Sequence, residues 1–211
     1  MTKEQTTTTK KDEVLTIEGK GRDKIGEDNK GSLIIRGNVG DVVGVLNEGT
    51  ITVNGNARHS VGWQNEGTIT VNGNVGEGVG DRNKGTLIVN GNAGKGVGVN
   101  NKGTLIVNGN AGKGLGDGNE GRIMVEGNAG DNVGWENDGT ILVEGKAGDF
   151  VGESNEGTIL VEGKAGERVG HDNHGTIIVI GTIKELHKKA SGTIIAGDVK
   201  EDHGIPWIKI T

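Results

Sequence analysis

An eighteen-residue unit recurs along most of this chain without insertion, and one asparagine at a fixed position marks each copy. The unit follows N-x-G-T-(I/L)-x-V-x-G-(N/K)-(A/V)-G-x-x-V-G-x-x, and residues 101–118 (NKGTLIVNGNAGKGLGDG) are a nearly ideal copy. A short unit in fixed register is typical of a solenoid, in which each coil packs only against its neighbours. The marker asparagines are Asn29, Asn47, Asn65, Asn83, Asn101, Asn119, Asn137, Asn155 and Asn173.

The stretch T-(I/L)-x-V-x within each unit predicts a short strand, because side chains of a strand alternate between its two faces. In the copy at 101–118, Leu105 and Val107 are expected to point inward, Ala111 to sit at a tight corner, and Leu115 to form a second inward point. The fold class is therefore all-β, a parallel β-helix with eighteen-residue coils, about nine full coils and capping segments. Right-handedness is expected because parallel crossovers prefer it.

The ends of the chain depart from the repeat, as terminal coils of a solenoid do. Val14–Gly26 keeps the apolar and glycine spacing without the N-x-G-T opening, which predicts a capping first coil. We divide the chain into a disordered polar tail at 1–12, the β-helix at 13–181 and a C-terminal capping segment at 182–211, the last containing a short helix at 183–190 and strand-like patterns at 191–197 and 205–210.

Two interpretations fit the marker asparagines, and both are structural. The side-chain amides stack from coil to coil, as in other asparagine ladders, or asparagine is present because it tolerates the left-handed conformation before a glycine. A second column ends in Lys146 and Lys164, which indicates that this corner faces solvent; its earlier members are Asn38, Asn56, Asn74, Asn92, Asn110 and Asn128.

Composition excludes several classes of function. The net charge is −6, with acidic and basic residues interspersed, and the three Trp residues are scattered, so we expect no nucleic-acid partner. The chain has no cysteine for a disulfide or thiolate metal site. Neither a signal segment nor an apolar run long enough to cross a bilayer is present. We therefore expect a cytoplasmic protein with no membrane partner.

Two sequence words resemble a known family. They are G-N-A-G-D-x-V-G, present at 127–134, and G-x-I-x-V-x-G, present at 139–145. The chain is similar, over roughly residues 13–181, to the glycine-repeat β-helix called the GXGXG domain, found in the large subunit of glutamate synthase and in one of the subunits of formylmethanofuran dehydrogenase. The resemblance implies a right-handed β-helix that serves as a scaffold beside catalytic subunits, with the redox and formyl-transfer chemistry elsewhere.

Literal matches to cofactor motifs carry little weight in a chain with 43 glycines. Gly116-x-Gly118-x-x-Gly121 satisfies the dinucleotide fingerprint but lies in no βαβ unit. GNAGKG, at 91–96 and 109–114, lacks the Ser or Thr and the helix of a phosphate loop. Repeat-type calcium binding needs an aspartate in every loop, and this position varies. We expect no cofactor and no metal.

Catalytic constellations are equally weak. Glu126, Glu144 and Glu162 form an outward column whose spacing from coil to coil is near the ~5 Å between the two carboxyl groups of retaining glycosidases. In earlier copies of the repeat this column holds arginine or asparagine, so only its polar character is kept. A glycan-active enzyme is thus the least favoured alternative. His171 and His174 share one turn, where a surface metal site is conceivable and solvated side chains are the commoner case. We assign no catalytic residue and expect a non-enzymatic protein.

An outward apolar column carries the most functional content. It lies between the two inward positions of each strand and reads Ile34, Thr52, Thr70, Ile88, Ile106, Met124, Leu142, Leu160 and Ile178. Beside it runs a hydroxyl-rich column, Ser32, Thr50, Thr68, Thr86, Thr104, Arg122, Thr140, Thr158 and Thr176. A contiguous apolar surface of this length usually marks an interface.

Three uses of this Thr/aliphatic face compete. Self-association in a symmetric oligomer is favoured, and docking of another protein, including a catalytic partner, comes second. Ice binding comes third, by analogy with flat Thr-rich solenoid faces, because charges at Arg36, Arg122, Glu126, Glu144 and Glu162 intrude on the plane. The sequence therefore predicts a structural or protein-interaction solenoid.

Overall fold

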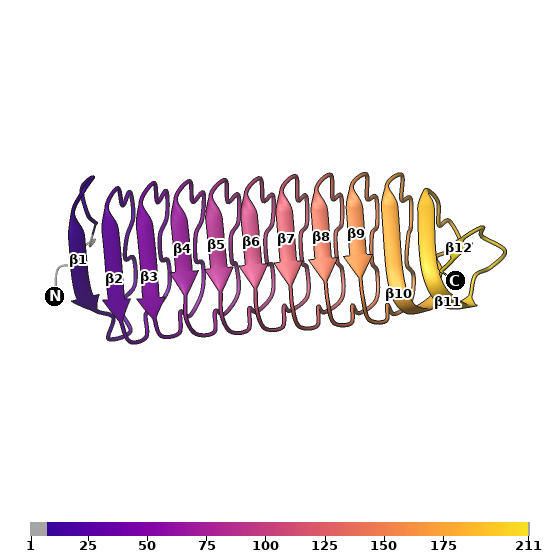
Figure 1. Cartoon of the computed structure of the whole chain (residues 1–211), viewed down its shortest axis with the longest axis horizontal. Helices are drawn as coiled ribbons and strands as arrows, with labels where there is room; N and C mark the ends of the chain where they lie inside the picture. Colours follow the sequence, from indigo (N-terminus) through magenta and orange to yellow (C-terminus); the bar gives the residue numbers. More distant parts are fainter. Residues whose placement is uncertain (1–7, 211) are drawn as a thin grey trace.

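The computed structural model describes residues 8–210, which form one elongated solenoid that advances by one coil per repeat (Figure 1). Twelve strands make one sheet, each strand paired in parallel with the next in sequence. The strands are β1 (Val14–Glu18), β2 (Ser32–Arg36), β3 (Thr50–Asn54), β4 (Thr68–Val71), β5 (Thr86–Val89), β6 (Thr104–Val107), β7 (Arg122–Val125), β8 (Thr140–Val143), β9 (Thr158–Val161), β10 (Thr176–Glu185), β11 (Thr193–Glu201) and β12 (Ile208–Lys209).

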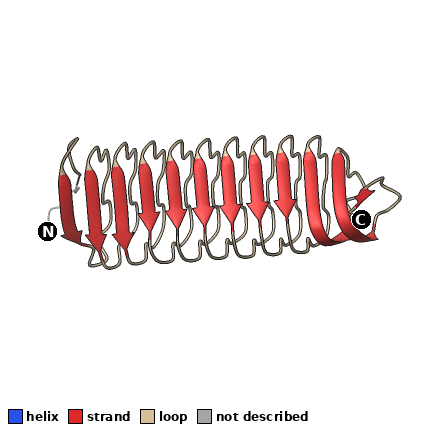
Figure 2. Cartoon of the chain, in the orientation of Figure 1, coloured by secondary structure: helices blue, strands red, loops and turns tan. Residues whose placement is uncertain are grey.

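The solenoid is right-handed. Its strands face the viewer and run downward while successive coils step from left to right, and each coil returns behind them (Figure 1). Between residues 8 and 210 the secondary structure is entirely strand and loop, with no helix (Figure 2). The predicted class, an all-β parallel β-helix with eighteen-residue coils, is confirmed.

The core is a thin column of aliphatic side chains, about four per coil. In the coil at 101–118, Leu105, Val107 and Leu115 are fully buried and Ala111 is nearly so. Outside the sheet, single bridges pair Ala111 with Ala93 and Leu115 with Val97. Each coil alone buries too little to be stable, so the stacking of coils supplies the core.

The N-x-G-T opening reflects how closely adjacent coils approach. The backbone N–H of Gly103 donates to the carbonyl of Asn83 in the coil before, at 2.9 Å. A Cβ on Gly103 would collide with the backbone carbonyl of Gly85. Glycine is therefore required by the packing of backbone on backbone at this corner.

The N-terminal end is more ordered than the predicted tail. Residues 1–7 of that tail lie outside the described residues, but Thr9 is 1% exposed and its carbonyl accepts the N–H of Lys30 at 2.9 Å. Thr9 is thus packed on the first repeat, which corrects the prediction of disorder at this residue, while residues 8 and 10–12 are exposed. β1 pairs with β2 over its whole length, so the predicted capping coil is confirmed.

The C-terminal end also differs from prediction. The helix expected at 183–190 is wrong, because β10 continues to Glu185. Ile183 and Leu186 are fully buried and bridge Ala165 and Val169 of the coil before, so core burial outweighs the helix-forming residues around them. The strands expected at 191–197 and 205–210 are present as β11 and β12.

Candidate interaction face and asparagine ladders

The marker asparagines form a continuous buried ladder. All nine are 0% exposed. Each Nδ2 from Asn29 to Asn155 donates to the Oδ1 of the asparagine in the next coil, at 2.7 to 2.9 Å. The same Nδ2 donates to the carbonyl two residues on, as from Asn101 to Gly103 at 2.9 Å. None of the nine marker asparagines has a positive φ. The left-handed conformation is taken by the residue before each of them, as by Asn100 before Asn101. Amide stacking is therefore the correct interpretation, and left-handed tolerance is not.

The ladder points in one direction, so its two ends need different partners. At the N-terminal end, Asn29 Oδ1 accepts from the hydroxyl and from the N–H of Thr9, the latter at 3.3 Å. At the C-terminal end, Asn173 Nδ2 donates to the carbonyl of Ser191 at 2.8 Å. The Ser191 hydroxyl in turn donates to the Asn173 carbonyl at 2.7 Å. Both ends of the buried ladder are hydrogen-bonded, as buried polar groups should be.

Two further asparagine columns lie on the surface, and one of them confirms the predicted solvent-facing corner. There, Asn110 Oδ1 accepts the backbone N–H of Asn128 at 2.8 Å, and Asn128 Oδ1 accepts that of Lys146 at 2.9 Å. The other column continues from the outer ends of the strands, where Asn108 Nδ2 donates to Asn90 Oδ1 at 2.8 Å. Side-chain ladders thus add to the backbone pairing outside the core as well.

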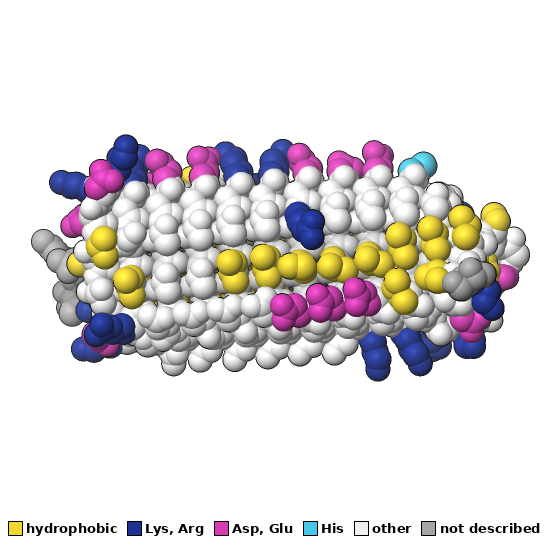
Figure 3. All heavy atoms as spheres, in the orientation of Figure 1, with side chains coloured by type: hydrophobic (Ala, Val, Ile, Leu, Met, Phe, Trp, Pro, Cys, Tyr) yellow, Lys and Arg dark blue, Asp and Glu magenta, His cyan; other side chains and the backbone are white. Residues whose placement is uncertain are grey.

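The sheet places the Thr/aliphatic face as predicted. Successive members lie directly opposite one another in the register, for example Ile106 with Met124 and Met124 with Leu142. Every aliphatic side chain of this column between β2 and β10 is half-buried, because its neighbours above and below cover its flanks. The outward edges of these side chains form an apolar stripe along the rod (Figure 3).

The stripe extends beyond the predicted residues toward the C-terminus, where it widens (Figure 3). Register places Ile195 of β11 opposite Ile178, and Ile208 of β12 opposite Ile195. Ile208 is 57% exposed, and Ile180, in the middle of β10, is 51% exposed. Sequence reasoning missed Ile195 and Ile208 because their segments lack the N-x-G-T marker that fixes register.

Charged residues border the stripe at a few defined places. Arg122 interrupts the hydroxyl-rich column on β7, and Glu126 lies in the same coil on the other side of the stripe. Glu126, Glu144 and Glu162 occupy the exposed polar column that reads Asn54, Asn72, Asn90 and Asn108 in earlier coils. The face is therefore three columns wide, with hydroxyls, aliphatic side chains and polar groups in parallel rows.

The two histidines singled out in the sequence have different surroundings. His171 Nδ1 lies 3.2 Å from Glu153 Oε1, and its ring packs edge-on against His187 with centroids 4.1 Å apart. His174 is exposed in a different column. Within the described part of the chain, neither belongs to a group of three potential metal ligands.

Comparison with protein-family models, with curated proteins and with solved structures found no match. Nothing between residues 8 and 210 is a helix able to cross a membrane. The features of the molecule that bear on function are the Thr/aliphatic face and the side-chain clusters at the ends of the rod.

Proposed function

We propose that this protein is a non-enzymatic structural solenoid that self-associates, with two copies packed face to face through the Thr/aliphatic face. The observation that carries the proposal is the half-buried aliphatic column, which is continuous from β5 to β11. Solvent should favour polar residues at such outward strand positions. A second copy would cover the column with an identical apolar surface.

The size of the face fits a stable dimer. Strands β1–β11, spaced by about 4.8 Å and about 16 Å wide, give a surface of about 800 Å² per copy. A standard protein interface buries about 800 Å² on each partner. The face is thus large enough for a specific interface without contributions from other surfaces.

The charges select one arrangement of the two copies. A twofold axis parallel to the rod places aliphatic column on aliphatic column, and each hydroxyl-rich column opposite the polar column of the other copy at the same height. Arg122 then faces Glu126 of the second copy, because both residues belong to one coil and flank the stripe symmetrically. Between β3 and β9, threonines face asparagines or glutamates, so hydroxyls can donate across the interface. An antiparallel arrangement centred on the sheet leaves Arg122 opposite a threonine, without a counter-charge.

Ice binding is less well supported, because Arg122 and the three glutamates break the regular hydroxyl plane. The first test is the solution mass, measured by light scattering after size exclusion, of wild type and of the double variant Ile106→Glu/Leu142→Glu. We expect a dimer for the wild type and a folded monomer for the variant. Lys113→Glu is the control, because it lies on another surface of the coil that contains Ile106 and makes the net charge more negative by the same amount as the double variant. It should leave the dimer intact.

The arrangement is tested by charge reversal. Arg122→Glu should weaken the dimer, because the new carboxylate faces Glu126, and Arg122→Glu/Glu126→Arg should restore it. A wild-type monomer would overturn self-association, after which ice and other proteins become the ligands to test. A dimer that ignores both charge variants would retain self-association and overturn the parallel arrangement.

A further inference from the structure

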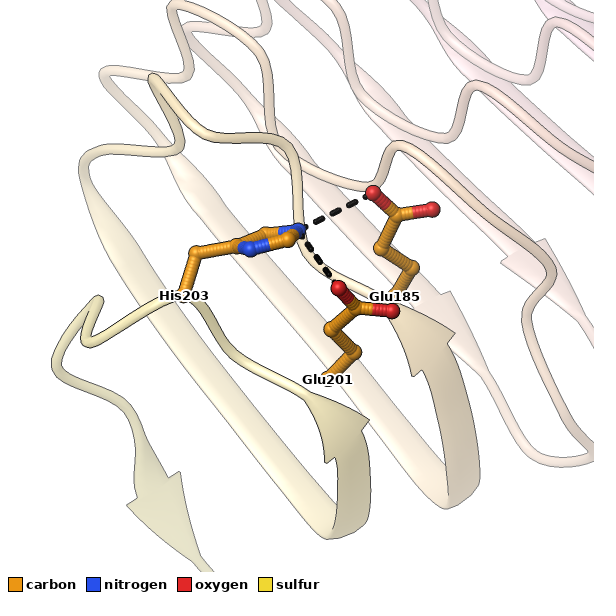
Figure 4. Close-up of side chains that lie close together, drawn as sticks. All are labelled: Glu185, Glu201 and His203. Carbon is orange, nitrogen blue, oxygen red and sulfur yellow. Dashed lines mark hydrogen bonds and ion pairs between the residues drawn. The ribbon is translucent and has the colours of Figure 1, made fainter.

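Two glutamates lie side by side where β10 and β11 end. Glu185 and Glu201 are direct register partners on these adjacent parallel strands. Like charges opposite one another across a sheet are unfavourable unless a positive group lies between them. His203, two residues beyond β11, supplies a third side chain to this place (Figure 4).

A tight turn after β11 aims His203 at the two carboxylates. His203 has a left-handed backbone with a φ of 52°. Asp202 holds the turn, since its Oδ1 accepts the N–H of Gly204 at 2.9 Å and its carbonyl accepts the N–H of Ile205 at 2.9 Å. The indole N–H of Trp207 also donates to Asp202 Oδ2 at 3.4 Å. Asp202 is thus engaged in shaping the turn.

The three side chains converge on one point. His203 Nε2 lies 3.0 Å from Glu185 Oε1 and 3.5 Å from Glu201 Oε1 (Figure 4). All three potential ligand atoms lie within 4.8 Å of one another. Tetrahedral zinc, with bonds of about 2.0 to 2.2 Å to nitrogen and oxygen, separates its ligand atoms by about 3.3 to 3.5 Å. The two separations from His203 Nε2 are therefore within about 0.5 Å of these values, and the two carboxylates need to approach each other from at most 4.8 Å.

Exposure gives the cluster the form of an open site. The side chains of His203 and Glu185 are 20% and 24% exposed, so they are held against the end of the rod. The Glu201 side chain is 63% exposed and leaves its side of the cluster open to solvent. Three protein ligands and an open fourth position suit a zinc ion that retains one water.

We propose that Glu185, Glu201 and His203 bind a divalent transition-metal ion of the zinc class. The ion neutralises the two paired carboxylates and joins β10, β11 and the turn after β11. Because Glu185 belongs to the strand before and His203 to the turn after β11, the bound ion ties the last coils of the rod together. The site is separate from the Thr/aliphatic face, and the proposal does not depend on self-association.

Isothermal titration calorimetry, in which zinc chloride is added to the metal-stripped chain without an affinity tag, tests the proposal. We expect one ion per chain, and a loss of affinity of at least about tenfold in His203→Gln. His171→Gln and His174→Gln are matched controls that should bind as the wild type does. Glu201→Gln is the second ligand variant, because this exposed side chain can be changed with little risk to folding.

Cobalt supplies a direct view of the ligands, since its visible absorption reports coordination number. The wild type should show the intense bands of a four-coordinate ion, and His203→Gln should lose them. Amide exchange in β11 should slow when zinc is added to the wild type alone. No zinc binding by the wild type, or equal binding by folded His203→Gln and Glu201→Gln, would overturn the proposal and leave His203 as an ion-pair partner only.

Discussion

Removing one amide from the middle of the buried ladder should destabilise the solenoid strongly. Asn101→Ala deletes three hydrogen bonds: Nδ2 to the Gly103 carbonyl, Nδ2 to Asn119 Oδ1, and the bond that Oδ1 accepts from Asn83 Nδ2, all at 2.9 Å. The side chain is 0% exposed, so water has no access to replace these bonds. The backbone bonds of the coil are unaffected by the change.

The magnitude follows from the partners that remain. Three intramolecular hydrogen bonds contribute about 1 kcal/mol each to the free energy of unfolding. The groups left behind keep other partners, since Asn83 Nδ2 still donates to Gly85 at 3.0 Å and Asn119 Oδ1 still accepts from Gly121 at 3.2 Å. The desolvation penalty should thus stay near its lower limit of about 1 kcal/mol. The total loss should be about 3 to 4 kcal/mol.

Native-state amide exchange is the appropriate assay, because repeat arrays open locally and need not unfold in one step. The N–H groups of Glu120 and Gly121, which donate to the Asn101 carbonyl at 2.8 and 2.9 Å, report on the altered coil. Their protection should fall by at least about a hundredfold, since 1.4 kcal/mol corresponds to a factor of about ten. Protection several coils away should change less.

Asn108→Ala is the matched control in the same coil. It removes one exposed ladder bond, from Asn108 Nδ2 to Asn90 Oδ1 at 2.8 Å, and should cost under about 1 kcal/mol because water replaces the partner. If Asn101→Ala and Asn108→Ala lower protection equally, burial of the ladder is not what makes it stabilising.

Two further predictions concern backbone conformation and pH. Gly116→Ala should lower the free energy of unfolding by about 1 to 3 kcal/mol more than Gly114→Ala. Both glycines have positive φ, so the backbone strain is similar. An added Cβ would lie 2.5 Å from Ile141 Cδ1 at Gly116, but 3.9 Å from its nearest neighbour at Gly114. Urea denaturation of both variants checks this difference, and equal losses would contradict it. Acidification should lower the melting temperature of the wild type more than that of His187→Gln, and parallel pH profiles would contradict this second prediction.

The sign of the pH effect follows from the surroundings of His187. Burial, then His171 and Arg168, lower its pKa, with a smaller contribution from Lys189 and an opposing one from Glu153. The N–H of Lys189 also donates to His187 Nδ1 at 3.1 Å, which favours the neutral ring. The folded pKa therefore lies below the unfolded value of about 6.5, so the unfolded chain binds more protons between the two. Stability is present above about pH 6.5 and is lost as the pH falls toward the folded pKa.

The coil could be predicted from sequence because each inference had nine copies to support it. Alternation identified Leu105 and Val107 as core, and both are fully buried. The same alternation placed Ile106 and Leu142 on the outer face, where they are half-buried. Periodicity fixes register when the period never changes, and register in a parallel solenoid determines which side chains are neighbours.

Prediction failed where the period changes. The offset between β10 and β11 falls from seventeen residues at Thr176 and Thr193 to sixteen at Glu185 and Glu201. That shift hid the pairing of the two glutamates. The sequence still contained one indication of the cluster, because Glu185 and His203 are separated by eighteen residues, the length of one coil. Local propensity in residues 183–190 favoured a helix, whereas the open core of the last coil required Ile183 and Leu186 as strand-like residues.

The direction of the asparagine ladder connects the ends of the rod with its state of assembly. Because every amide donates toward the C-terminus, one end of the ladder presents an acceptor and the other a donor. These ends are complementary, so two open rods would extend one ladder head to tail. Thr9 occupies the acceptor of Asn29 and Ser191 occupies the donor of Asn173, which removes that complementarity. Closing the ladder at both ends thus opposes head-to-tail growth into a fibre, whereas the proposed face-to-face pair would close on itself.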